Sequence, residues 1–134
     1  MVEINNENKE VLLAVYGTLR RGQGNWNYLL NGNSEFVGTT TTPPEYTMYG
    51  KRSGFPIVAK KGNTSIEIDV FKVTNNEVLR RVHGLESCSG IPGDPRNWYD
   101  IQPIETEFGK AYIYLQNNYE NPTNIIESGN WLNR

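Results

Sequence analysis

The chain has 134 residues, of which 37% are hydrophobic, a length that allows one hydrophobic core but not two ordinary domains. Its formal net charge is -2, and no cluster of Lys and Arg interleaves with aromatic residues, which argues against the basic surface of a nucleic-acid-binding protein. The longest apolar run, residues 11–16, is far shorter than the ~20 residues of a membrane helix. We therefore expect neither nucleic acid nor a membrane as a partner.

The N-terminal region and the cysteine content point to a cellular compartment. Residues 1–10 are polar and acidic, unlike a secretory signal, and we expect them to form a flexible tail ahead of a single domain over residues 11–134. Cys88 is the only cysteine, so no intrachain disulfide can form. A reducing, cytoplasmic location fits both features.

The first half of the domain reads as short strands. The apolar run over residues 11–16 predicts a strand that is covered on both faces. Asn25 is a candidate cap for a short helical turn. Residues 35–38 and 46–49 then predict two strands separated by a proline pair, because proline interrupts regular pairing.

The middle of the chain carries the clearest periodicities. Alternation over residues 64–73 predicts a strand, with Asp69 on the same face as Phe71. Thr74 and Glu77 have the spacing of a capping box, in which each side chain satisfies a backbone donor at a helix start. A helix over residues 75–85 follows from this signal.

The last third predicts a hairpin and a final helical turn. Residues 98–105 and 110–116 have the pattern of two strands joined by a tight turn. Asn121 and Pro122 predict the start of a last helical turn, which Gly129 would end. Many strands with one central helix indicate an α+β domain, built as a small barrel or a strongly curled sheet.

Glu86 is a candidate proton acceptor. Val78, Val82 and Glu86 fall at positions i, i+4 and i+8, so this carboxylate extends the apolar stripe of the central helix. Loss of hydration and the negative end of the helix dipole would both raise the pKa of Glu86 there. In the alternative interpretation, Gly84 ends the helix early and Glu86 points into solvent from a loop.

The loop after the first strand, YGTL at residues 16–19, is a candidate anion site. Glycine directly after a buried strand allows a sharp turn and a close approach by another molecule. Consecutive amides in such a turn can form a nest for a carboxylate or a developing oxyanion. An ordinary turn is the alternative for this stretch.

The chain offers few residues for a metal or a nucleotide. One His and one Cys cannot close a tetrahedral zinc shell, and the spacing of His83 and Cys88 defines no nucleophile and base pair. The sequence contains neither a Walker loop nor GxGxxG. We expect no metal and no cofactor.

Tyr112 and Tyr114 share one face of their strand, which can line a cavity.

A series of short motifs occurs in a distinctive order along nearly the whole domain. They are YGTLRRG at residues 16–22 followed by Asn25, GFP at 54–56, IDVFKV at 68–73, GLE at 84–86, WY at 98–99, YIY at 112–114 and SGNW at 128–131. In this order they resemble the gamma-glutamylcyclotransferase-like family. The YGTLRxG motif is the most specific of them, and Leu-Glu at the end of the central helix is the next.

The resemblance implies a fold, a reaction and a set of site residues. It implies a small mixed β-barrel with flanking helices and a cofactor-free cavity for a small gamma-glutamyl compound. In such a protein the YGTL loop holds the gamma-glutamyl group, and Glu86 transfers protons while 5-oxoproline is released. The substrate-binding residues expected on this basis are Tyr16, Gly17, Thr18, Leu19, Phe55, Pro56, Asp69, Tyr99 and Tyr112.

The sequence also departs from the family pattern. Ile68-Asp69 stands where Gly-Glu is usual, Ser87 stands where glycine is usual, and residues 88–97 lengthen the loop beside Glu86. Two alternatives to an enzyme follow: a non-catalytic small-molecule binding module of the same fold, and an interaction protein that docks a partner through its aromatic surface or this loop. The leaving group stays open among a peptide, an amino acid, a lysine side chain and a polyamine.

Overall fold

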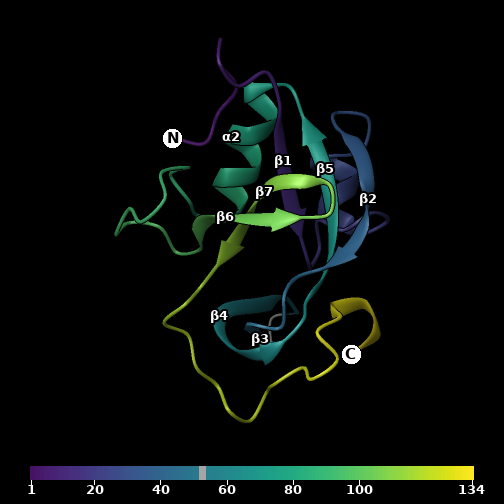
Figure 1. Cartoon of the computed structure of the whole chain (residues 1–134), viewed down its shortest axis with the longest axis vertical. Coiled ribbons are helices and arrows are strands. Elements are labelled where there is room, and N and C mark those ends of the chain that lie inside the picture. Colours follow the sequence, from purple (N-terminus) through teal and green to yellow (C-terminus); the bar gives the residue numbers. More distant parts are fainter. Residues whose placement is uncertain (52–53) are drawn as a thin grey trace.

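The computed structural model describes residues 1–51 and 54–134 (Figure 1). Within these residues a five-stranded sheet has the order β2-β5-β1-β7-β6, and β3 and β4 form a second sheet. The strands are Val11–Val15 (β1), Glu35–Thr41 (β2), Tyr46–Gly50 (β3), Pro56–Thr64 (β4), Glu67–Val73 (β5), Asp100–Thr106 (β6) and Gly109–Leu115 (β7). The helices are Gly24–Leu29 (α1), Asn76–Leu85 (α2) and the short 3-10 helix Trp131–Asn133 (η1).

β1 is the central strand of the larger sheet. It pairs antiparallel with β5 and parallel with β7, so the sheet is mixed. Leu13 and Ala14, which point to opposite faces, are both fully buried. A strand buried on both faces has a nearly continuous apolar sequence. The prediction from the apolar run over residues 11–16 is therefore confirmed.

Two apolar clusters cover the two faces of this sheet. On one face, α2 contributes Val78, Leu79 and Val82, which belong to the same cluster as Leu13 and Val73. Figure 1 shows α2 beside the sheet, with the β3–β4 pair lying next to the C-terminal part of the chain. On the other face, the second cluster unites residues of the sheet with those of β3, β4 and η1. Its members include Ala14, Met48, Val58, Ile68, Ile113 and Trp131.

The second sheet is held by hydrogen bonds from the segment that follows β7. The Gln116 amide, just past β7, donates to the Val58 oxygen of β4 (2.9 Å). The Ile126 amide donates to the Met48 oxygen of β3 (2.8 Å). The predicted α+β class is confirmed, whereas the strands of the described residues form two sheets and no closed barrel.

The predicted central helix and hairpin are confirmed, with one change at the helix start. α2 begins at Asn76, and its N-cap is Asn75, whose side chain accepts a hydrogen bond from the Glu77 amide (2.7 Å). The predicted cap, Thr74, precedes this residue. Asn and Thr both cap helices, and sequence spacing cannot separate two adjacent candidates. The β6–β7 hairpin turns between Thr106 and Gly109.

Two local expectations are wrong, and one strand, β4, has no counterpart among the expected elements. Asn25 lies inside α1 rather than capping it, since the N-cap is Gln23. Residues 121–129 do not form the expected helical turn, because this segment pairs with β3 at Tyr49 and Ile125; the helical turn comes after Gly129, in η1.

The first residues of the expected flexible tail are docked on the domain. The Val2 amide donates to the Gly90 oxygen (2.7 Å), and Val2 is buried. The Ile4 amide donates to Asn76 Oδ1 (2.6 Å), and the Asn76 amide group donates back to the Ile4 oxygen (2.7 Å). Val2 and Ile4 alternate with exposed Glu3, so one side of this short stretch packs against the domain. The expectation of a free tail does not hold for residues 2–4.

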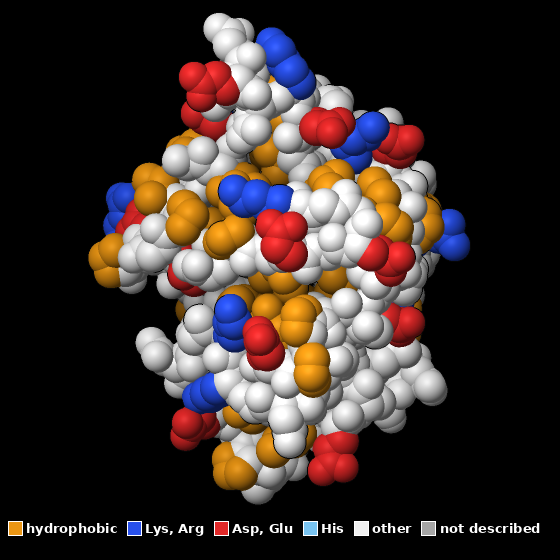
Figure 2. All heavy atoms as spheres, in the orientation of Figure 1, with side chains coloured by type: hydrophobic (Ala, Val, Ile, Leu, Met, Phe, Trp, Pro, Cys, Tyr) orange, Lys and Arg blue, Asp and Glu red, His pale blue; other side chains and the backbone are white. Residues whose placement is uncertain are grey.

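The surface carries charges of both signs. Figure 2 shows Lys and Arg side chains interspersed with Asp and Glu on the face that it displays. Among the helices of the described residues, none has the length and apolar character that crossing a bilayer requires.

Candidate active site

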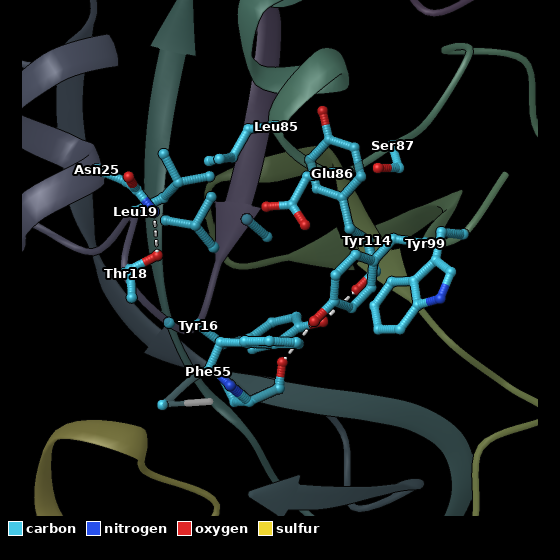
Figure 3. Close-up of a pocket in the computed structure, with 16 residues that line it drawn as sticks. Tyr16, Thr18, Leu19, Asn25, Phe55, Leu85, Glu86, Ser87, Tyr99 and Tyr114 are labelled. Atoms are coloured by element: carbon cyan, nitrogen blue, oxygen red, sulfur yellow. Dashed lines mark hydrogen bonds between the residues drawn. The ribbon is translucent and has the colours of Figure 1, made fainter. Parts of the chain in front are cut away.

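A cavity of about 530 Å³ opens where β1 ends (Figure 3). Its described lining residues are Ala14, Val15, Tyr16, Gly17, Thr18, Leu19, Asn25, Gly54, Phe55, Pro56, Leu85, Glu86, Ser87, Trp98, Tyr99 and Tyr114. Glu86 is the one carboxylate among them. In the part of the chain that the structure describes, no three His, Cys, Asp or Glu side chains are grouped to hold a metal ion.

Most of the predicted site residues meet at this cavity. Those that line it are Tyr16, Gly17, Thr18, Leu19, Phe55, Pro56, Glu86 and Tyr99. They come from the end of β1, the start of β4, the end of α2 and the residues just before β6. Segments far apart in the sequence thus surround one hollow, as their shared motif pattern predicted.

Asp69 does not line the cavity and is a correction to the predicted site. Its buried carboxylate accepts hydrogen bonds from Arg20 Nη2 (3.2 Å), the Arg21 amide (2.9 Å) and the Thr39 hydroxyl (2.7 Å). In the β1–β5 ladder Asp69 lies opposite Val15, directly beside the loop that carries Arg20. A buried carboxylate next to a buried guanidinium pairs with it, so Asp69 holds the loop rather than a ligand.

Arg20 is a residue of the YGTLRRG motif to which sequence reasoning assigned no role. It is only 5% exposed, although arginine is rarely buried without a partner. Its Nη1 atom donates to Glu67 (3.2 Å) and to Asn130 (3.0 Å), in addition to the Asp69 bond of Nη2. Arg20 therefore ties the loop after β1 both to β5 and to the C-terminal part of the chain.

Tyr112 is the second correction. It shares a face of β7 with Tyr114, but Tyr114 lines the cavity and Tyr112 does not. Tyr112 is half-buried, and the Lys110 ammonium lies 5.3 Å from the centroid of its ring. Alternation along a strand predicts which residues share a face, but only the position along β7 decides which of them reaches the cavity.

The hydroxyl of Tyr114 is bound to a buried histidine. His83 Nδ1 lies 2.7 Å from Tyr114 Oη, and His83 Nε2 lies 3.1 Å from the Val2 oxygen. Because a carbonyl oxygen only accepts, we assign the proton to Nε2, and Tyr114 then donates to Nδ1. Burial lowers the pKa of His83, which favours this neutral form. His83 thus fixes the ring that forms one wall of the cavity.

The YGTL loop lines the cavity with all four of its residues. The Gly17 oxygen accepts from the Arg20 amide (3.0 Å), and the Thr18 oxygen accepts from the Trp26 amide (3.1 Å). The Asn25 side chain donates to the Thr18 hydroxyl (2.6 Å), which further fixes the turn. Within the described residues, no backbone oxygen accepts from the amides of Gly17, Thr18 or Leu19. These amides are available to an anionic group of a ligand.

Gly17 is required by packing as well as by the turn. A Cβ atom added at this position would lie 2.7 Å from Pro56 Cγ and 2.9 Å from Pro56 Cδ. The glycine therefore lets the start of β4 approach the loop and close the cavity. This contact adds to the ligand approach on which the sequence expectation rested.

Glu86 directs its carboxylate into the cavity. It is the C-cap of α2, and its amide donates to the Val82 oxygen (3.1 Å), so the helix continues past Gly84. Figure 3 shows the carboxylate pointing toward the space enclosed by the rings of Tyr16, Tyr99 and Tyr114. Burial raises the pKa of Glu86 to about 7. The alternative of a glutamate in a solvent-facing loop is not what the structure shows.

The tyrosines around Glu86 donate their protons elsewhere. Tyr16 donates to the Tyr114 backbone oxygen, and Tyr99 donates to the Pro56 backbone oxygen (2.7 Å). Burial and then the nearby Glu86 charge raise the pKa of Tyr99, so its hydroxyl stays neutral. No side chain or amide of the described residues donates a hydrogen bond to the Glu86 carboxylate. A ligand in the cavity would be its partner.

Ser87 occupies the position where the family pattern has glycine. Its φ is 49°, in the left-handed region that costs an L-residue roughly 1–2 kcal/mol. The Ser87 oxygen accepts from the Trp98 amide (2.9 Å), and the Glu86 oxygen accepts from the Tyr99 amide (3.4 Å). The turn at Ser87 thus brings the aromatic pair before β6 back to the cavity, across the lengthened loop.

Comparison with known proteins places the chain in a family. The sequence profile described as gamma-glutamyl cyclotransferase, AIG2-like, matches residues 13–133. The chain belongs to this family. The match includes every described residue that lines the cavity.

Individual relatives agree with this assignment. A Vibrio cholerae relative is 32% identical over 123 residues, which are 92% of this chain and 96% of that protein. The gamma-L-glutamyl-butirosin B gamma-glutamyl cyclotransferase of Niallia circulans is 29% identical over 118 residues, 80% of this chain and 69% of that protein. The crystal structure of a Pyrococcus horikoshii protein superimposes with a TM-score of 0.69 at 26% identity, over 90% of this chain and 89% of that one.

The Arg20–Asp69 ion pair yields a stability prediction. Asp69→Asn is expected to lower the free energy of unfolding by about 3 kcal/mol, because it leaves the buried Arg20 charge without its buried partner. Glu67→Gln serves as the control, since the Glu67 side chain is 33% exposed and its loss should cost less than about 1 kcal/mol. Urea unfolding measures both; equal effects of the two substitutions would contradict the role of Asp69.

The raised pKa of Glu86 predicts that this residue destabilises the fold when ionised. Glu86→Gln is expected to raise the free energy of unfolding at pH 8 by up to about 3 kcal/mol, because the pKa rises from 4.5 to about 7 on folding. This increase in the free energy of unfolding should develop between pH 4.5 and about 7. At lower pH it should vanish, because Glu86 is then protonated in both the folded and the unfolded state. Unfolding at pH 4 and pH 8 tests this, with exposed Glu77→Gln as control.

Proposed function

We propose that the protein is a cofactor-independent gamma-glutamylcyclotransferase, which releases 5-oxoproline and a free amine or amino acid from a gamma-glutamyl amide. The observation that carries the proposal is the position of the Glu86 carboxylate. It is half-buried, and among the described residues no group donates a hydrogen bond to it. It shares one cavity with residues 17–19, whose amides have no backbone acceptor within the described residues. Membership of the gamma-glutamyl cyclotransferase, AIG2-like family supports it. The name of the Niallia circulans relative describes this reaction on a gamma-glutamyl compound.

The proposed reaction takes place within one substrate molecule. The α-amino nitrogen forms a bond to the δ-carbonyl carbon, and the bond between that carbon and the leaving nitrogen breaks. Both reacting groups belong to the glutamyl part, so the enzyme's first task is to hold this chain folded. Correct orientation of intramolecular partners can contribute ~7–11 kcal/mol to lowering a barrier. The cavity volume of about 530 Å³ is in the range typical of small-molecule sites.

Glu86 moves the protons in this proposal. As a carboxylate it takes a proton from the α-ammonium group, which frees the nitrogen to attack. As a carboxylic acid it then gives a proton to the leaving nitrogen. A pKa of about 7 suits a group that must act in both forms near neutral pH. A positioned acid and base contributes roughly 10²- to 10⁴-fold to the rate.

The YGTL loop binds the charged end of the substrate. Amides of Gly17, Thr18 and Leu19 would bind the α-carboxylate or the oxygen on which negative charge develops, and losing one such donor costs several kcal/mol, roughly 3–4. Phe55, Pro56, Tyr16 and Tyr99 would pack around the glutamyl chain. Their apolar surfaces exclude water, which strengthens the polar contacts.

A reducing, cytoplasmic setting is also part of the proposal. Cys88 is free and buried, with burial raising the pKa of its thiol, as expected of a structural cysteine. A small-molecule substrate is the proposed partner.

A panel experiment tests the proposed function. The purified protein is incubated with gamma-glutamyl amino acids, amines and dipeptides, and 5-oxoproline is detected by mass spectrometry. Product from any member is the expected result. Binding without product would support the alternative of a non-catalytic binding module instead.

Glu86→Gln is expected to retain the fold and lower kcat at least about 100-fold, because it keeps the shape of the side chain but removes the proton acceptor. Glu77→Gln on the exposed side of α2 should leave kcat unchanged. The kcat of both variants is measured by steady-state kinetics, and circular dichroism checks that they are folded. Undiminished turnover in Glu86→Gln would refute the assignment.

The pKa of Glu86 also predicts the pH dependence of the reaction. Because the ionised form accepts the first proton, kcat/KM is expected to rise with pH through a midpoint near 7 and then level off. Residual activity of Glu86→Gln should lack this rise. A profile that is flat between pH 5 and pH 8 in the unmodified enzyme would contradict the role of Glu86.

A further inference from the structure

A lysine lies over the aromatic rings beside the cavity. The Lys51 ammonium is 5.6 Å from the ring centroid of Phe55 and 5.4 Å from that of Trp98, two residues that line the cavity. It is also 5.9 Å from the centroid of Tyr119. Lysine within about 6 Å of an aromatic face is attracted by the ring electrons. The three rings therefore hold this cation next to the cavity.

The backbone keeps Lys51 in this place. It directly follows the last residue of β3, and its amide donates to the Phe55 oxygen (3.1 Å). The Gly54 amide donates to the Lys51 oxygen (3.0 Å). Gly54 and Phe55 both line the cavity, so these two hydrogen bonds hold Lys51 beside its border.

Lys51 differs from three of the other lysines of the protein in its charge partners. Lys60, Lys61 and Lys72 each have a carboxylate within 4 Å. Among the described residues, no carboxylate lies that close to the Lys51 ammonium. The aromatic faces attract the cation without neutralising its charge. Lys51 can therefore still pair with an anion of a ligand.

A second hollow lies next to the cavity, on the side of Lys51. It has a volume of about 850 Å³ and shares Gly54 with the cavity. Its lining includes the side chains of Lys51 and Arg134, together with the C-terminal residues from Thr123 to Ser128. Among its described lining residues, Lys51 and Arg134 are cations and Glu127 is the carboxylate. If the glutamyl end of a substrate lies between the YGTL loop and Glu86, the leaving group is the part that extends toward this hollow.

We propose that Lys51 is a specificity-determining residue, which selects gamma-glutamyl substrates whose leaving amine carries a carboxylate. This inference rests on the proposed function. A gamma-glutamyl amino acid would place its free carboxylate near the Lys51 ammonium, and opposite charges attract there. A gamma-glutamyl diamine would instead bring a second cation to the place that Lys51 already occupies, and like charges repel. An uncharged alkylamide would gain nothing from Lys51.

Three probes that differ mainly in the charge of the leaving group test the proposal. They are γ-L-glutamyl-L-alanine, γ-L-glutamyl-ethylamide and γ-L-glutamyl-(2-aminoethyl)amide, whose leaving groups carry a carboxylate, no charge and an ammonium group. Release of 5-oxoproline from each is measured for the unmodified protein and for Lys51→Met, which removes the charge and keeps an unbranched side chain. Lys110→Met is the matched control, because Lys110 also lies over a ring, that of Tyr112, but outside the cavity.

The unmodified protein is expected to favour the alanine compound over the ethylamide by about two- to fivefold in kcat/KM, the range for partly exposed charge pairs. The difference should lie in KM, because Lys51 acts away from the reacting atoms. The preference for the alanine compound should shrink in 0.5 M NaCl, because salt screens the charge pair. It should disappear in Lys51→Met but persist in Lys110→Met. Equal preference in the unmodified protein and Lys51→Met, or the aminoethyl amide as the best substrate, would overturn the inference.

Failure of the proposed function would be recognised separately. If none of the probes yields 5-oxoproline, the three compounds are titrated against the same proteins and their Kd values are compared by calorimetry. Tighter binding of the alanine compound that is lost in Lys51→Met would support the role of Lys51 in a binding module. Kd values without this charge dependence, or no binding of any probe, would overturn it.

Discussion

The buried ion pair between Arg20 and Asp69 is the contact on which the cavity depends. It joins the loop after β1 to the neighbouring strand β5, and the second arm of Arg20 reaches Asn130 near the C-terminus. A buried ion pair adds little net stability, but either charge alone would be costly. It therefore restricts the loop to the conformations in which both charges meet. This restriction holds the YGTL loop, whose residues line the cavity, in one place.

A second charge in the interior has no such partner. Glu86 follows the apolar stripe of α2 and enters the cavity, where no cation of the described lining residues lies beside it. Burial therefore raises its pKa. These two carboxylates illustrate opposite uses of the same chemical group. Asp69 is paired and holds structure, whereas the unpaired Glu86 keeps a proton affinity near neutral pH. The site thus combines a rigid frame with a reactive group that weakens the fold when ionised.

Local patterns predicted most of the strands and the central helix, and the family resemblance supplied candidate site residues, most of which line the cavity. The apolar run of β1 and the stripe of α2 each depend on neighbours in the sequence, and both predictions are confirmed. The expected roles of Asp69 and Tyr112 differ from what the structure shows. Periodicity places a residue on a face, but it does not say that Asp69 would meet Arg20 or that β7 would carry Tyr114, rather than Tyr112, to the cavity.

By itself the sequence determined the family, the α+β class and the candidacy of Glu86 and the YGTL loop, because motifs and helical spacing are properties of adjacent residues. The tertiary structure decided which distant groups meet. Pro56 against Gly17, His83 against Tyr114 and Lys51 over Trp98 are contacts between separate elements. Such contacts depend on how sheets and loops pack in three dimensions, and no spacing along the chain encodes them.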